Sequence, residues 1–330
     1  MERQGLNSPF FRQERVPDVC SLRQNFAEVY RLCDTGQIIC EISISAGLKS
    51  PVEIAAIADP HICKADAMDE QDEELRLTRR RRFYHVYNGV SVRAVENCLE
   101  VCRHFPQTVV LGDVIDYCSH GALTLAQQCL FGAEDAPLCI PGNHEYRKQM
   151  DTGLPEKTPN EEKAHLLEQF WPNDLHFAKR QVAEDLILLG LDNGTGHFWS
   201  GTLDRLRQEL DRAEEQGCKV LILQHIAFRT ANSHGETSLA DWGFETQRQD
   251  FSQGDGALCG AAQDVQDQQI LDLIAGKPDT VKAVITGHYH SLFRTVLQDG
   301  TGAPTAIPQF SLAAPIFVGF CGLVHILKVQ

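Results

Sequence analysis

The stretch Val52-Glu-Ile-Ala-Ala-Ile-Ala-Asp-Pro-His61 decides the fold of this chain. Its apolar run over residues 54–58 predicts a buried strand, which ends at a turn carrying Asp59 and His61. Because side chains two positions apart on an extended segment point the same way, the turn directs one carboxylate and one imidazole towards a common point. Alone, this pair is weak evidence, since many strands end in polar residues that cap the next element.

The same pattern recurs along the chain. An apolar strand is predicted to end in Asp, Asn or His at four more places: Gly112-Asp113-Val114-Ile115-Asp116, Gly142-Asn143-His144-Glu145, Gln224-His225 and Gly287-His288-Tyr289-His290. Carboxylate, imidazole and amide groups suit Mn, Fe or Zn rather than soft metals. A single histidine after a strand is more often a structural cap, but five such strand ends together predict a metal site.

Composition limits the classes of partner. The chain has 330 residues, without repeats or a low-complexity linker, so we expect one domain with additions. Its net charge of −15 argues against nucleic acid or an anionic membrane as a partner. An acidic protein can still bind a phosphate where metal ions and a few arginines make the pocket positive.

The twelve cysteines are interpreted as reduced thiols. No Cys-x-x-Cys pair occurs, and the polar N-terminal segment lacks the apolar stretch of a signal peptide. Disulfides are rare in reducing compartments, so the predicted location is the cytoplasm.

Apolar periodicity predicts alternating helices and strands. Helices are expected at 21–33, 91–105, 123–130, 163–170, 202–216 and 265–274, and strands at 37–45, 54–58, 108–111, 137–140, 219–223 and 281–286, with a strand pair over 182–191. Residues 1–50 are expected to form an N-terminal extension packed on a core domain of residues 51–330, with strand 37–45 in a hairpin with the next. The run 310–327 predicts two buried strands closing a sheet rather than a membrane span.

The five polar segments at the strand ends form five sequence blocks. In their order along the chain, these blocks resemble the motif of the calcineurin-like metallophosphoesterases, and they span residues 59–290. The resemblance implies an α/β fold, a four-layer α/β/β/α sandwich, with two metal ions at the carboxyl ends of the central strands. The implied ligands are Asp59, His61 and His290 for one ion, Asn143, His225 and His288 for the other, and Asp113 as a bridge between both. The resemblance also implies that His144 acts as a general acid and that Asp116 orients it.

This resemblance implies metal-dependent hydrolysis of a phosphate ester by a hydroxide that bridges two ions of Mn, Fe or Zn. Two ions about 3.5–4 Å apart lower the pKa of bound water to about 7 and neutralise charge on the phosphoryl oxygens. A small-molecule phosphodiester, such as a cyclic nucleotide, is the favoured substrate. A phosphomonoesterase, a protein phosphatase and a non-catalytic scaffold stay open as alternatives. Scaffolds typically lose ligands and none is missing here, which favours an enzyme.

Two insertions, at about 62–88 and 229–264, lie outside the shared motif and are the expected specificity elements. In the first, six acidic residues over 66–74 run into the basic residues Arg76 and 79–82, which predicts either a solvated, self-paired helix or phosphate clamps. The second is long, polar and glycine-rich, as functional loops are. Arg229 and Arg147 are the predicted substrate-binding residues.

Overall fold

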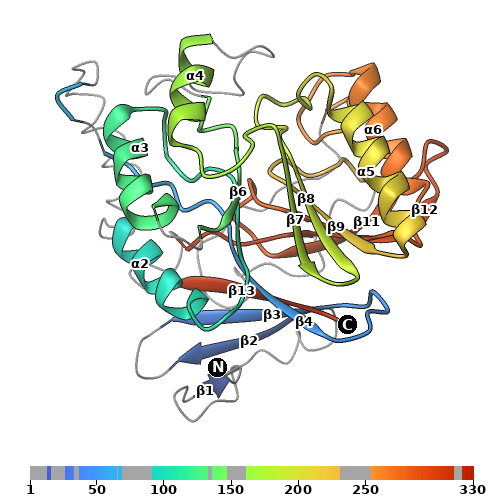
Figure 1. The fold of residues 1–330 in the computed structure, drawn as a ribbon, viewed down its shortest axis with the longest axis horizontal. Helices are drawn as coiled ribbons and strands as arrows, with labels where there is room; N and C mark the ends of the chain where they lie inside the picture. Colours follow the sequence, from blue (N-terminus) through green and yellow to red (C-terminus); the bar gives the residue numbers. More distant parts are fainter. Residues whose placement is uncertain are drawn as a thin grey trace.

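The structure is a computed structural model, and it describes residues 13–15, 27–32, 37–64, 66–68, 91–132, 136–146, 161–230, 254–315 and 322–330. Two β-sheets pack face to face, and helices cover their outer faces (Figure 1). The first sheet has seven strands in the order β1-β2-β3-β13-β4-β5-β6, and the second has six in the order β11-β12-β10-β9-β8-β7. The predicted four-layer α/β/β/α sandwich is confirmed.

The strands follow the apolar runs of the sequence. The first sheet contains β1 (Gln13–Arg15), β2 (Ala27–Leu32), β3 (Ile38–Ile44), β4 (Val52–Ile57), β5 (Thr108–Leu111), β6 (Leu138–Ile140) and β13 (Leu323–Val329). The second contains β7 (Phe177–Ala183), β8 (Leu186–Leu191), β9 (Lys219–Gln224), β10 (Val281–Thr286), β11 (Phe293–Gln298) and β12 (Pro304–Ser311). Both faces of the central strands are buried, which is why these runs are apolar without interruption.

Helices form the outer layers. The first sheet is covered by α2 (Ser91–Cys102), by α3 (His120–Ala126), which continues into a π-helical turn at Gln127–Phe131, and by α4 (Glu161–Phe170). The second sheet is covered by α5 (Thr202–Gln216) and α6 (Val265–Ala275). In α5, Leu206, Leu210 and Ala213 form one buried face, and Gly217 ends the helix with a left-handed φ of 68°. The predicted bounds of α5 are confirmed.

Two predictions near the N-terminus are wrong. The structure describes residues 27–32 of the expected helix at 21–33, and they form β2, with Ala27 and Val29 buried and Glu28 exposed. Tertiary pairing decides this, because β2 lies antiparallel to β3 with Ala27 opposite Ile42. The expected hairpin between β3 and β4 is also absent, since β13 lies between these strands, parallel to β3 and antiparallel to β4.

The C-terminal apolar run contributes to both sheets. It contains the end of β12 and most of β13, as two buried strands, but they do not close one sheet: β12 pairs with β10 and β11, and β13 pairs with β3 and β4. Each strand has a neighbour on both sides, and the described residues of the run, 310–315 and 322–327, are buried, which explains their lack of charge. Among the described residues, no helix is long and apolar enough to span a bilayer.

Candidate metal centre

The carboxyl ends of five strands meet at one edge of the sandwich. In the first sheet, β4, β5 and β6 run parallel, and in the second β9 and β10 run parallel. The turns that follow these strands carry all the predicted ligands: Asp59 and His61 after β4, Asp113 after β5, Asn143 after β6, His225 after β9, and His288 and His290 after β10. Because parallel strands end at the same edge, seven side chains that lie far apart in the sequence come together.

One group of candidate ligands consists of Asp59, His61, Asp113 and His290. Ligand atoms of these four side chains lie within 4.8 Å of one another. The Nε2 atoms of His61 and His290 face each other at 3.0 Å, and His290 Nε2 lies 3.6 Å from Asp59 Oδ1. This arrangement can hold one cation.

A second group consists of Asp113, His225 and His288, whose ligand atoms also lie within 4.8 Å of one another. Asn143 completes it, since its Oδ1 atom lies 3.1 Å from His225 Nε2 and 2.9 Å from His288 Nδ1. This group offers imidazole, carboxylate and amide oxygen donors around a second point.

Asp113 belongs to both groups. Its Oδ1 atom lies 3.2 Å from His225 Nε2, while its Oδ2 atom lies 3.7 Å from His61 Nε2. One carboxylate therefore presents a different oxygen to each group, as a ligand shared between two cations must.

His144 lies beside both groups. Its Nδ1 atom donates to the main-chain oxygen of Asp116 at 2.7 Å and lies 3.1 Å from Asp116 Oδ1. Asp116 Oδ1 is also 3.4 Å from His61 Nδ1, so this carboxylate contacts two imidazoles, whereas a contact with His144 alone was predicted. Burial would raise the pKa of the Asp116 carboxyl, but the contacts with His144 and His61 outweigh burial and hold the pKa below its usual range.

The backbone at this edge is strained. Five non-glycine residues of the described chain have a left-handed φ, between 48° and 71°: Asp59, His61, Asp113, His288 and His290. All five belong to the two candidate ligand groups. Such conformations cost about 1–3 kcal/mol each and cluster at functional sites, where the surrounding structure holds them in place.

Two glycines allow the strand ends to approach one another. A Cβ atom on Gly142 would lie 2.3 Å from Asp113 Oδ1, and one on Gly112 would lie 2.4 Å from His225 Nδ1. Gly112 also has a φ of 79°. Any side chain at these positions would displace a candidate ligand, which explains the glycines that precede Asp113 and Asn143.

In the metal-free protein, three buried candidate ligands have shifted pKa values. Burial lowers the pKa of His225, but the charges of Asp113 and Asp59 outweigh burial and raise it to about 9. Burial raises the pKa of Asp59 to about 7, with a further contribution from Asp113. For His290, burial and the neighbouring His61 lower the pKa well below its ordinary value.

The residues present fit a pair of metal ions. Asp59 Oδ2 is buried and has no hydrogen-bond partner among the described residues. An unpartnered buried carboxylate oxygen is costly, and a cation would satisfy it. Carboxylate, imidazole and amide donors converge at the same edge, and this donor set suits Mn, Fe or Zn.

Two residues that hold the ligand-bearing turns in place, Glu145 and Asn193, were not predicted from the sequence. Glu145 accepts hydrogen bonds from the backbone N–H groups of Asp113, Ile115 and Gly142, and so joins the turns after β5 and β6. Asn193 Oδ1 accepts from the N–H groups of His225 and Ile226, which holds the turn after β9. The signal was available for Asn193, because the apolar strand β8 also ends in polar residues, Asp192 and Asn193.

Of the two predicted substrate residues, the structure describes Arg229 alone, and this side chain bonds away from the ligand groups. Arg229 is exposed, and its Nε atom donates to the main-chain oxygen of Gly256 at 2.9 Å, so it stabilises the base of the second insertion. Arg147 lies outside the described residues, as do residues 65 and 69–88 of the first insertion and 231–253 of the second.

Solved structures with a similar chain path include a dimetal phosphatase from Danio rerio, which is 16% identical with a TM-score of 0.47, covering 81% of this chain and 88% of that one. The structure of PhoD is 11% identical with a TM-score of 0.42, and the match covers 88% of this chain and 62% of that one. A putative 5'-nucleotidase from Staphylococcus aureus is 13% identical with a TM-score of 0.40, and the match covers 81% of this chain and 49% of that one. No curated protein matches the sequence.

The sequence also matches a family model. The model describes the calcineurin-like phosphoesterases, and it covers residues 52–292, from the first residue of β4 to just beyond His290. The matched segment contains all seven candidate ligands and His144. The chain therefore belongs to the calcineurin-like phosphoesterase family and is a metal-dependent hydrolase of phosphate esters.

Proposed function

We propose that this enzyme hydrolyses a small-molecule phosphodiester, such as a cyclic nucleotide, at a dinuclear centre. The proposed ligands are Asp59, His61, Asp113, Asn143, His225, His288 and His290. The observation that carries the proposal is the position of Asp113, whose two oxygens face the two groups separately. A carboxylate shared in this way offsets the repulsion between two cations.

The charge of the donor set supports a singly charged substrate. Asp59 and Asp113 are its only carboxylates, and the other five ligands are neutral when they bind a metal. Two divalent ions held by these ligands would leave two uncompensated positive charges, and a hydroxide bound with them would reduce this to one. That remaining charge would match the single negative charge of a phosphodiester.

His144 is proposed to protonate the leaving oxygen. When bound, the ions supply Lewis acidity and lower the pKa of water to about 7. The leaving alkoxide still needs a proton, and His144 Nε2 lies 3.8 Å from Asp113 Oδ2, at the edge of both ligand groups. Asp116 accepts from the opposite nitrogen and so holds the ring with Nε2 towards the ligand groups.

The test combines metal analysis with a substrate panel. The purified protein should contain two transition-metal ions per chain, and Asp113→Asn should lose most of both ions and of the activity. Asp267→Asn is the matched control, because Asp267 is also buried and paired with a histidine, His197, but lies on α6. A protein that binds one ion would contradict the dinuclear assignment, and an Asp113→Asn variant that keeps two ions would contradict the role of Asp113 as the shared ligand.

The panel distinguishes the substrate classes. It contains cyclic nucleotides, an aryl phosphodiester, matched phosphomonoesters and a phosphopeptide. We expect the highest kcat/KM for a diester. If the monoesters or the phosphopeptide are hydrolysed faster, the assigned substrate class changes to a phosphomonoester or a phosphoprotein, while the proposed metal site stays the same.

The proposal includes a reducing compartment, namely the cytoplasm. The structure describes nine of the twelve cysteines, none of these nine is in a disulfide, and six of them are buried. Burial raises the pKa of the Cys102 thiol to about 12, which keeps this thiol protonated and unreactive. Titration of the denatured protein, purified without reductant, should find all twelve thiols free.

A further inference from the structure

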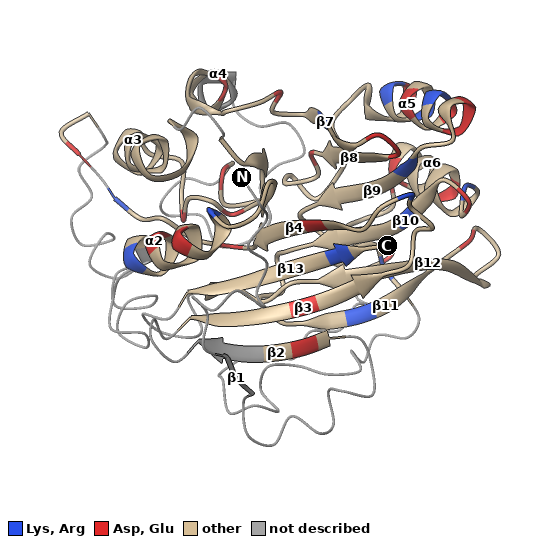
Figure 2. Cartoon of the chain, turned by 60° about the horizontal axis from the view of Figure 1, so that its bottom comes forward, with Lys and Arg blue, Asp and Glu red and all other residues tan. Residues whose placement is uncertain are grey.

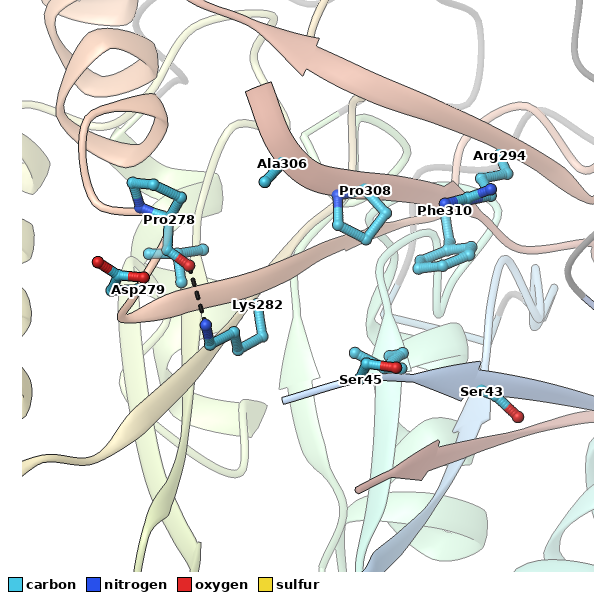
Figure 3. A pocket seen from close by; sticks show the side chains of 11 residues that line it. Ser43, Ser45, Pro278, Asp279, Lys282, Arg294, Ala306, Pro308 and Phe310 are labelled. Carbon is cyan, nitrogen blue, oxygen red and sulfur yellow. Dashed lines mark hydrogen bonds between the residues drawn. The ribbon is translucent and has the colours of Figure 1, made fainter. Parts of the chain in front are cut away.

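A cavity lies at the opposite end of the sandwich from the metal centre. It has a volume of about 600 Å³ and is lined by residues of β3, β10, β11 and β12 (Figure 3). Pockets for small ligands typically measure about 300–1,000 Å³. Lys282, near the start of β10, lines the cavity, whereas His288 follows the other end of this strand, about 20 Å away for six extended residues.

A β-bulge directs Lys282 into this cavity. Val281 packs in the core beneath α5 and α6, whereas Ala283 packs in the core between the sheets, although residues two apart on a regular strand share a face. The pairing of β10 with β9 shifts register between these two residues. Bulges re-aim side chains in this way, and here the bulged residue is a lysine that lines the cavity.

Arg294 enters the cavity from the neighbouring strands. It lies on β11 directly opposite Phe310 of β12, so both side chains project from the same face of the sheet. Phe310 packs in the core between the sheets, which places Arg294 on that inner face. In Figure 3, Arg294 lies beside Phe310, and Lys282 lies on the side of Pro278. Two cations and an apolar wall of Pro308 and Phe310 therefore share one cavity.

Neither cation is paired with a carboxylate in the described structure. Many basic side chains of this acidic protein form ion pairs, including several on α5, where both charges alternate (Figure 2). The ion-paired basic residues are Lys49, Lys179, Arg205, Arg207, Arg212, Lys277 and Lys328.

By contrast, Lys282 donates to the main-chain oxygen of Pro278 at 3.0 Å, which leaves two further protons to donate. Burial and the charge of Lys219 lower the pKa of Lys282, as expected for an ammonium group short of negative charge. Asp279 supplies the one carboxylate among the residues that line the cavity.

We propose that this cavity binds a small organic anion, whose carboxylate, sulfonate or phosphate group is attracted by the two cations that line it, Lys282 and Arg294, and whose apolar body packs against Pro308 and Phe310. The site is separate from the metal centre, and its ligand need not be the substrate. Charge-assisted hydrogen bonds provide the affinity and the apolar wall selects for an organic ligand.

The test measures binding of a fluorescent aromatic anion, anilinonaphthalene sulfonate, to the full-length protein. We expect saturable binding with one site per chain. The double variant Lys282→Met, Arg294→Gln should weaken it about tenfold or more. The matched control is Lys179→Met, Arg180→Gln, which removes one lysine and one arginine from β7, at the opposite edge of the same sheet.

Ala306→Trp separates binding in the cavity from general charge attraction. Ala306 lines the cavity and is exposed, so an indole there should fill the space while both cations stay, and binding should be lost. Three results would overturn the proposal: no saturable binding to the unaltered protein, equal weakening by the β7 control, or equally tight binding of the uncharged phenylnaphthylamine.

Discussion

Asp116 fixes the orientation of His144 through two contacts. The main-chain oxygen of Asp116 lies 2.7 Å from His144 Nδ1, and its Oδ1 atom lies 3.1 Å from the same nitrogen. Both contacts require the Nδ1 proton to point at Asp116. The opposite nitrogen, Nε2, then faces the ligand groups, and it is the atom that can exchange a proton with a substrate.

The first prediction follows from this orientation. His144→Ala should lower kcat by about 10²–10⁴-fold for a substrate with an alkoxide leaving group, since general acid catalysis is lost. A nitrophenyl ester should be affected much less, because nitrophenolate leaves without a proton. Metal content, measured by elemental analysis, should be unchanged. An equal loss of activity on both substrates, or a loss of metal, would show that His144 is a ligand or a structural residue.

The second prediction concerns the stability of the metal-free protein between pH 6.5 and 9. Folding raises the pKa of His225 from 6.5 to about 9 and that of Glu145 from 4.5 to about 8, the latter through burial and the charge of Asp113. A raised pKa means that the folded state binds more protons than the unfolded state. The stabilisation that this proton gives to the folded state is therefore lost as the pH rises through the folded-state pKa.

Thermal unfolding of the metal-free protein should therefore show a Tm that falls steadily from pH 6.5 to 9. His225→Gln should reduce this dependence, because a neutral side chain replaces the titrating one. Added metal should also reduce it, since bound ions displace the protons. A Tm that is constant or rises over this range would contradict the assignment.

The third prediction tests Asn193 as a positioning residue. It bonds the N–H groups of His225 and Ile226 and the oxygen of Ile226, so Asn193→Ala should lower metal affinity by about 10–100-fold. Asn173→Ala is the matched control, because Asn173 bonds both backbone groups of Cys139 on β6 in a similar way. Both variants should lose about 1–3 kcal/mol of stability. Equal metal affinity in the two variants would limit Asn193 to a structural role.

The fourth prediction concerns the insertion that follows β9. Its two ends lie side by side, because Phe228 pairs with Leu258 and the Arg229 N–H donates to the Ala257 oxygen at 2.8 Å. Replacing residues 233–253 by a short Gly-Ser link should therefore preserve the fold, the metal content and the turnover of a small activated ester. The KM for the natural substrate should rise, because this insertion is an expected specificity element that starts beside His225. An unchanged profile across the substrate panel would rule out a role in specificity.

The sequence alone determined the strand ends and their chemistry. An apolar run followed by a polar turn is a local signal, so Asp59, Asp113, Asn143 and His225 could each be placed after a strand. The bounds of α5 were equally local, because its apolar period and Gly217 lie within the helix itself and at its end. From these local signals and the order of the blocks, the family and the two-sheet fold could be predicted.

Only the tertiary structure decided how these pieces pair. Residues 27–32 became a strand because β3 offers a partner, and β13 separates β3 from β4 although it comes from the far end of the chain. The left-handed backbone at Asp59 and Asp113, and the contact of Asp116 with His61, also depend on residues remote in sequence. Such features arise from packing between distant segments, which local propensity and periodicity do not encode.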